Sequence, residues 1–198
     1  MEINYSKLSI GDLVFVSGTS WISKMIKVVE TGKANPEKHF PFVPSHVGVI
    51  REVFGIDGDQ LAEVVFSGKR LNFSIKDYIN KGSKVIVKRL NLPTAHYNQF
   101  STRKAIEYIV DEIKVRGYDW QLITSYLIRF SIRKIWRWKK TRWISGMLDK
   151  KKMFHCAEYI ARFLGWLKIE VPEFPTPWDL YRKIDAVEID YMKKDNLK

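Results

Sequence analysis

The chain has 198 residues, 45% of them hydrophobic and 14% aromatic, which is enough to bury the core of one domain. Its formal net charge of +12 favours anionic partners such as nucleic acid, acidic lipid headgroups or anionic cell-wall polymer, and its single cysteine excludes an intramolecular disulfide. No apolar run reaches membrane-spanning length, and the first residues lack the order of a secretory signal, so a cytoplasmic location is expected.

Short strands dominate the first half of the predicted structure. They cover residues 12–16, 46–53, 61–66 and 84–90. An Asp-Gly turn signal between the second and third of these strands predicts an antiparallel hairpin. Two helices are also expected: Ser20 caps one over residues 21–30, and Ser74 opens a short one with Asp77 as its capping-box partner.

Helices dominate the second half. Ser101 opens an amphipathic helix, and residues 120–148 are expected to be mostly helical. A further helix covers residues 156–164 and stops at Gly165, after which the proline-rich segment 171–178 is extended and the last residues form a polar tail. Strands first and helices last predict an α+β fold with an antiparallel sheet.

The only cysteine, Cys156, stands at the first turn of a predicted helix, behind three lysines at 150–152. A single thiol is usually a small apolar packing residue. A thiol at a helix N-terminus beside positive charge is instead a nucleophile, because both features stabilise the thiolate. The lysines are also consistent with an ordinary solvated run, so the local sequence leaves both roles open.

Thiol catalysis needs a base and a group that orients the base. His46 opens a predicted strand, and Glu63 interrupts the apolar run of the next strand. A carboxylate there is costly to bury without a partner, and an adjacent imidazole would be one. The alternative is that both side chains face water on a half-exposed sheet, and spacing alone does not decide between these readings.

The other three histidines are weaker candidates for the base. His155 is next to Cys156, and consecutive residues on a helix do not face each other, so a capping or supporting role is expected for it. His39 and His96 fall in predicted loops and should be solvated. No two of these residues stand at ligand spacing, so we expect neither a metal nor another cofactor.

Six segments occur in an order that is known from one family. They are GDLVFVSG near the start, SHVGVI, the glutamate within LAEVVF, GYDW at 117–120, FHCAEYIARFLG and TPWDL at 176–180. As an ordered set, from about residue 11 to residue 181, they resemble the permuted papain-like cysteine hydrolases and amidases, the NlpC-type group with YiiX-like bacterial members. Each segment alone is a weak signal, whereas the ordered set is fairly specific.

The resemblance implies a circularly permuted papain-like fold, in which an antiparallel sheet or small barrel packs against helices in a single domain of residues 1–198. It also implies a catalytic triad in the chain order His46, Glu63, Cys156. Tyr118 matches a family tyrosine and is expected to support the oxyanion or orient the substrate, together with the Cys156 backbone N–H. A core tyrosine is the alternative for Tyr118.

Residues 121–153 depart from the family pattern, because they are long for the link before the cysteine helix. They predict a basic, tryptophan-rich amphipathic helix that either docks on the domain or contacts an anionic surface, membrane or polymer. Stacking on single-stranded nucleic acid ranks behind these readings. The residues expected to make such a contact are Arg133, Lys134, Trp136, Arg137, Trp138, Lys139, Lys140, Arg142 and Trp143.

The sequence therefore predicts a cysteine-dependent amidase or peptidase that works through an acyl-enzyme. Relatives of the resembled family act on cell-wall peptide or on acyl lipid, and amide hydrolysis is the favoured reaction. One alternative is an acyl-lipid thiol hydrolase or acyltransferase. The other is a non-catalytic binding or structural protein that contacts an anionic surface through the basic helix.

Overall fold

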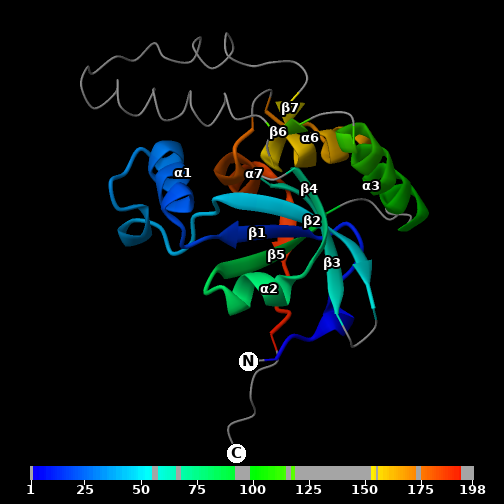
Figure 1. The fold of residues 1–198 in the computed structure, drawn as a ribbon, viewed down its shortest axis with the longest axis horizontal. Coiled ribbons are helices and arrows are strands. Elements are labelled where there is room, and N and C mark those ends of the chain that lie inside the picture. Colours follow the sequence, from blue (N-terminus) through cyan, green and yellow to red (C-terminus); the bar gives the residue numbers. More distant parts are fainter. Residues whose placement is uncertain are drawn as a thin grey trace, which may run out of the picture.

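A computed structural model describes residues 2–54, 58–65, 68–91, 99–114, 117–118, 153–154, 156–172 and 175–192. Its main feature is a six-stranded antiparallel sheet with the strand order β4-β3-β2-β1-β5-β8 (Figure 1). The strands are β1 (Leu13–Ser17), β2 (His46–Val53), β3 (Asp59–Val65), β4 (Gly68–Phe73), β5 (Lys84–Leu90) and β8 (Ala186–Glu188). Within the described residues, β4 and β8 are the edges, so this is an open sheet and not a closed barrel.

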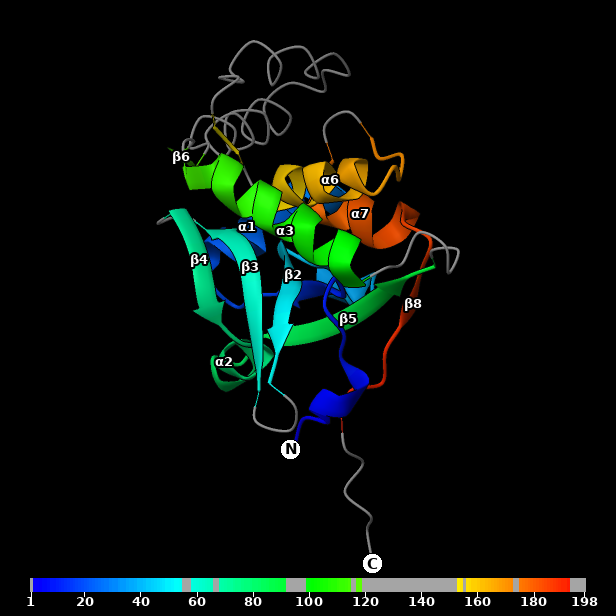
Figure 2. The same ribbon diagram turned by 90° about the vertical axis from the view of Figure 1, so that its right-hand side faces the viewer.

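The helices lie on both sides of this sheet. They are α1 (Trp21–Thr31), α2 (Ile75–Asn80), α3 (Gln99–Lys114), α6 (Cys156–Trp166) and α7 (Pro177–Lys183), with two short 3-10 helices, η1 (Tyr5–Lys7) and η2 (Pro36–Lys38). In both views α3, α6 and α7 cover one face, and α2 covers the other (Figures 1 and 2). The predicted α+β class with an antiparallel sheet is confirmed.

Strand β1 lies near the middle of the sheet and is buried on both faces. Leu13 and Phe15 pack into the cluster formed with α3, α6 and α7, whereas Val14 and Val16 pack into the cluster that contains Ile75 of α2. Successive side chains of a strand point to opposite faces, so the uninterrupted apolar run of β1 follows directly from a sheet that is covered on both sides.

Capping residues start three of the helices, α1, α2 and α7. Ser20 accepts a hydrogen bond from the Ser23 N–H at the start of α1, and Ser74 with Asp77 forms the predicted capping box of α2. Thr176 and Asp179 form a second capping box that starts α7, with Pro177 in its first turn. The prediction that residues 171–178 are extended throughout is therefore wrong at its end, because proline at the first helical position starts a helix.

Several further boundaries differ from the prediction. Strand β4 was not expected, α3 begins at Gln99 and not at Ser101, and α6 runs through Gly165 to Trp166. The C-terminal part is not simply a polar tail, since β8 pairs with β5 and Met192 forms a bridge with Ile3. These short elements depend on partners far away in the sequence, which local patterns do not reveal.

A second, two-stranded sheet joins distant parts of the chain. Strands β6 (Gly117–Tyr118) and β7 (Met153–Phe154) pair in parallel, with Tyr118 opposite Phe154. The predicted helix over 120–148 lies outside the described residues. Among the residues that are described, no helix is long and apolar enough to cross a membrane.

Asp59, at the start of β3, is a buried carboxyl group whose contribution to stability depends on whether it is protonated. Its Oδ2 accepts the Ile75 N–H at 3.1 Å, while its Oδ1 has no hydrogen-bond partner among the described residues. Burial, with a smaller contribution from the charge of Asp77, raises the pKa of Asp59 to about 6. Because this folded-state pKa exceeds the ordinary value of 3.8, the stability that Asp59 contributes at low pH is lost as the pH rises through about 6.

We expect Asp59→Asn to raise the free energy of unfolding by about 1–3 kcal/mol at pH 8, since the amide cannot ionise but still accepts the Ile75 N–H. The gain should vanish near pH 4, where the wild-type carboxyl group is protonated. Urea denaturation at the two pH values measures both differences. An equal effect at pH 4 and pH 8 would contradict the assignment of a costly buried charge.

Candidate active site

His46 and Glu63 come together on neighbouring strands. The Nε2 atom of His46, the first residue of β2, lies 2.7 Å from the Oε2 atom of Glu63 on β3. The Glu63 side chain is fully buried, and the His46 side chain is 16% exposed. The alternative in which both residues face water is therefore wrong, because the sheet is covered on the face where they meet.

Gly48 provides the space for this pair. It follows His46 on the same face of β2, where a side chain would point toward Glu63. A Cβ atom placed at Gly48 would lie 3.3 Å from the Glu63 Cβ and 3.5 Å from its Oε2. Glycine at this position lets the Glu63 carboxylate lie against the β2 backbone and reach the imidazole without steric conflict.

Cys156 is the third side chain of the site and interacts with His46. It is the first residue of α6, which packs against β2 and β3, and it is buried and forms no disulfide. The thiol is hydrogen-bonded to the His46 side chain. Since Nε2 is engaged by Glu63, Nδ1 is the ring nitrogen that remains for the sulfur. Sulfur, imidazole and carboxylate therefore form one hydrogen-bonded row.

The charges in this row favour a protonated histidine. Burial alone would lower the pKa of His46, but the charge of the Cys156 sulfur, the charge of Glu63 and the hydrogen bonds to both raise this pKa to about 10. At neutral pH the ring is then an imidazolium that contacts both the sulfur and the carboxyl group of Glu63. An imidazolium in contact with a sulfur favours the nucleophilic thiolate form of that sulfur.

Tyr78 is a member of the site that the sequence analysis did not identify. Its hydroxyl group donates to Glu63 Oε2 at 2.6 Å, and its ring centroid lies 6.0 Å from that of His46. Tyr78 belongs to α2, on the face of the sheet opposite to α6. A tyrosine in a short amphipathic helix carries no local signal of this contact, so only the folded structure reveals it.

Glu30, near the end of α1, is a second residue that the sequence analysis missed. Its Oε2 accepts the Trp178 N–H at 3.1 Å. Burial raises the pKa of Glu30 well above its ordinary value, and the charges of Cys156 and Asp179 raise it further, against the opposing effect of the Trp178 hydrogen bond. The site therefore contains a second carboxyl group, which stays protonated to a higher pH than an ordinary glutamate.

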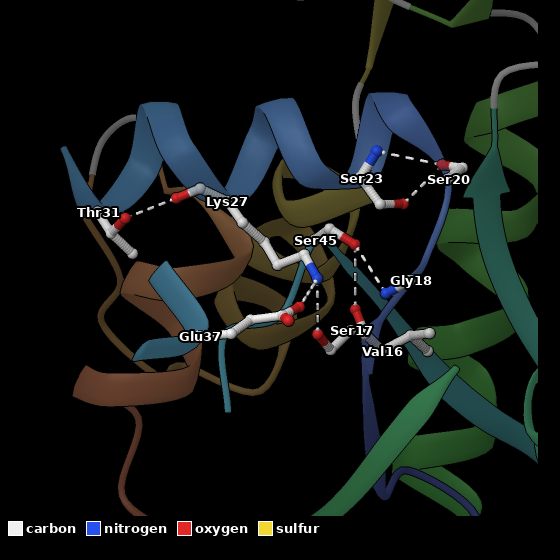
Figure 3. Close-up of polar contacts among 9 residues, drawn as sticks. All are labelled: Val16, Ser17, Gly18, Ser20, Ser23, Lys27, Thr31, Glu37 and Ser45. Carbon is white, nitrogen blue, oxygen red and sulfur yellow. Dashed lines mark hydrogen bonds and ion pairs between the residues drawn. The ribbon is translucent and has the colours of Figure 1, made fainter. Parts of the chain in front are cut away.

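A buried lysine holds α1 against the sheet (Figure 3). The Lys27 Nζ atom lies 2.6 Å from Glu37 Oε1 and 3.1 Å from Ser17 Oγ, and the Lys27 side chain is 3% exposed. These contacts tie the helix that carries Glu30 to the end of β1. Because a buried ammonium group is stable only with such partners, Lys27 fixes the place of α1.

The segment that leads into His46 is held at the same end of β1. The Ser45 backbone N–H donates to the Val16 carbonyl group at 2.8 Å. Figure 3 shows the Ser45 hydroxyl group, which accepts the Gly18 N–H at 3.1 Å. Both bonds involve the residue that directly precedes His46. The imidazole is therefore carried by backbone that is fixed on both sides, by Ser45 before it and by the β1–β2 pairing after it.

Several predicted site residues lie partly or wholly outside the described part of the chain. The backbone of Tyr118 is placed in β6, alongside the segment that leads into Cys156, but its side chain is not described. His155, His96, the lysines at 150–152 and the whole basic segment 133–143 are likewise outside it. His39 follows η2 and is exposed, as expected. The described residues include no group of three His, Cys, Asp or Glu side chains that could hold a metal ion.

No family model matches the sequence, and a search of curated proteins also found no match. The assignment of a function therefore rests on the geometry of the site and on the ordered sequence segments.

The charge of Glu30 can be tested with thiol reagents of different charge. As the pH rises and Glu30 ionises, anionic iodoacetate should react with Cys156 progressively more slowly than neutral iodoacetamide. Glu30→Gln keeps an acceptor for the backbone N–H of Trp178 but cannot ionise. At high pH, the ratio of the iodoacetate rate to the iodoacetamide rate should therefore be roughly threefold higher in this variant than in the wild type. Mass spectrometry of the labelled chain measures both rates without ambiguity, because Cys156 is the only cysteine.

The matched control is Glu52→Gln, which removes a glutamate that pairs with Arg51 on β2. This change should leave the ratio at its wild-type value over the whole pH range. If Glu30→Gln and Glu52→Gln behave alike, the Glu30 carboxyl group does not act on the thiol.

Proposed function

We propose that the protein is a cysteine-dependent hydrolase of the amidase or peptidase type, in which Cys156 is the nucleophile, His46 the acid–base group and Glu63 the residue that orients His46. The observation that carries the proposal is the hydrogen-bonded row from the thiol through the imidazole to the buried carboxylate. A catalytic triad is recognised by the roles and geometry of its members, and these three side chains fill all three roles.

The proposal includes a permuted papain-like fold. In papain-like enzymes the helix that carries the cysteine precedes the strand that carries the histidine, whereas here β2 and β3 precede α6. A circular permutation changes the chain order and leaves the spatial arrangement unchanged. The α6 helix with Cys156 at its start, packed against the strands of His46 and Glu63, is the arrangement that such a permutation would preserve.

The proposed reaction follows from the protonation states of Cys156, His46 and Glu63. The Cys156 thiolate attacks the carbonyl carbon of the amide, so that a C–S bond forms and the carbonyl electron pair moves to oxygen. The His46 imidazolium donates its proton to the amide nitrogen as the C–N bond breaks, which releases the amine and leaves a thioester on Cys156. Neutral His46 then takes a proton from water, and the resulting hydroxide attack releases the acid and the thiolate.

The developing oxyanion needs donors close to the sulfur. The backbone N–H of Cys156 lies in the first turn of α6, where amide groups have no acceptor within the helix. We assign this N–H to the oxyanion, with Tyr118 as a second contributor, because β6 runs beside the segment that enters α6. For the substrate we propose an amide in a peptide, with cell-wall peptide as the leading class.

Thiol labelling tests the triad directly. At pH 6 an unassisted thiol is almost entirely protonated, so His46→Ala should slow alkylation of Cys156 by iodoacetamide by roughly 10–100-fold. Glu63→Gln should slow it less, and Cys156→Ser should abolish it. His39→Ala is the matched control, because His39 is an exposed histidine that follows η2, and its labelling rate should equal that of the wild type.

The hydrolase step needs a separate measurement. An activated acyl ester such as p-nitrophenyl acetate should give a stoichiometric burst of nitrophenolate and an acetyl group on Cys156, followed by turnover that depends on His46. Equal labelling of the His46→Ala and His39→Ala variants, with no acyl group on Cys156, would contradict the proposed function.

A further inference from the structure

One oxygen atom of the Glu63 carboxylate accepts hydrogen bonds from two donors. His46 Nε2 and the Tyr78 hydroxyl group lie 2.7 Å and 2.6 Å from Glu63 Oε2 and reach it from different elements, β2 and α2. The Glu63 side chain is fully buried, so water cannot replace either donor. Two short bonds to a single oxygen fix both the position of the carboxylate and its rotation about the last side-chain bond.

The helix that carries Tyr78 is itself held firmly on the sheet. Its first residue, Ile75, is fully buried, and the Ile75 N–H donates to Asp59 of β3. Phe73, just before the helix, meets the Tyr78 ring edge-on with the centroids 4.8 Å apart. Strand β3 is therefore joined to α2 at two points, through Asp59 and through Glu63, and the hydroxyl group of Tyr78 has little freedom to turn elsewhere.

We propose that Tyr78 is a positioning residue, whose hydroxyl group keeps the Glu63 carboxylate charged and directed at His46 and thereby sustains the thiolate–imidazolium pair. This inference rests on the proposed function and adds a fourth side chain to the site, from the face of the sheet opposite to the nucleophile. Tyr78 acts through Glu63 and is not proposed to touch the substrate.

The pH dependence of the site follows from this role. A hydrogen bond to the charged form of a carboxylate lowers its pKa, so removing the Tyr78 hydroxyl group makes Glu63 easier to protonate. Protonated Glu63 no longer stabilises the His46 imidazolium, and the thiolate is then lost at a higher pH. The acid limb, which is the low-pH side of the profile of thiol reactivity against pH, should move upward by about one pH unit, because a hydrogen bond to a charged group is stronger than one between neutral groups.

The other titratable groups around Glu63 do not produce the same effect. Cys156 and Tyr159 of α6 are two of them, and the strand register places Arg70 of β4 opposite Glu63. Burial raises the pKa of Tyr159; Arg51 opposes this rise and Glu63 adds to it, so Tyr159 stays neutral through the acid limb. Glu30 and Asp59, whose pKa values burial raises, also ionise as the pH rises, but both are present in the wild type and in the variants compared below, so the comparison isolates the effect of the Tyr78 hydroxyl group.

The experiment compares two tyrosine-to-phenylalanine changes. Tyr78→Phe keeps the ring contacts and removes only the hydroxyl group. Tyr191→Phe is the matched control, because Tyr191 is also buried and its hydroxyl group also donates a hydrogen bond, but to the Val85 carbonyl group, at 2.9 Å, and not to Glu63. The rate of Cys156 alkylation by iodoacetamide is measured from pH 4 to pH 9 for the wild type and both variants.

We expect the acid limb to move upward by about one pH unit in Tyr78→Phe, with a loss of roughly tenfold in rate on that limb. The profile of Tyr191→Phe should match that of the wild type even if its melting temperature falls. In a Glu63→Gln background, Tyr78→Phe should cause no further shift, because the hydroxyl group then has no carboxylate to act on.

Each failure has a separate meaning. If Tyr78→Phe matches Tyr191→Phe while His46→Ala still slows labelling, Tyr78 is only structural and this inference is overturned, although the proposed function survives. If His46→Ala does not slow labelling, the proposed function itself fails. Should Tyr78→Phe not fold, Tyr78→Met also removes the hydroxyl group while filling the space with a flexible apolar side chain, and an unmoved acid limb in that variant would equally overturn the inference.

Discussion

The burial of one carboxylate organises the centre of this structure. Glu63 lies in the interior of a sheet that is covered on both faces, where an unpartnered negative charge would be too costly to keep. Its cost is offset by an imidazole from β2 and a hydroxyl group from α2. The glycine at position 48, the fixed start of β2 and the firm attachment of α2 all serve the geometry that this burial requires.

The two-sided sheet explains how distant segments build one site. The α6 helix brings the nucleophile from one side, α2 brings the tyrosine from the other, and β2 and β3 place the histidine and glutamate between them. A rigid sheet limits the relative movement of groups that must stay within hydrogen-bond distance. The α1 helix adds a second carboxyl group near the sulfur, and the buried Lys27 holds this helix in place.

The sequence predicted the residues whose local context is unusual. A glutamate within an apolar strand, a histidine at the start of another strand and a lone cysteine at a helix start each depart from the ordinary pattern, and the structure brings all three together. Tyr78 and Glu30 look ordinary in their helices, and their roles depend on contacts across 15 and 148 residues of sequence. Likewise, β8 could not be predicted, because three residues form a strand only when β5 is there to pair with them.

The most direct test of the central claim is the protonation state of the His46 ring, measured by its nitrogen chemical shifts in solution as the pH is varied. We predict an imidazolium at neutral pH that titrates near pH 10, and a clear fall in the pKa of His46 when Cys156 is replaced by alanine, because the sulfur that raises this pKa is removed. A neutral ring at pH 7, with a pKa near 6.5 that does not respond to Cys156→Ala, would contradict the account.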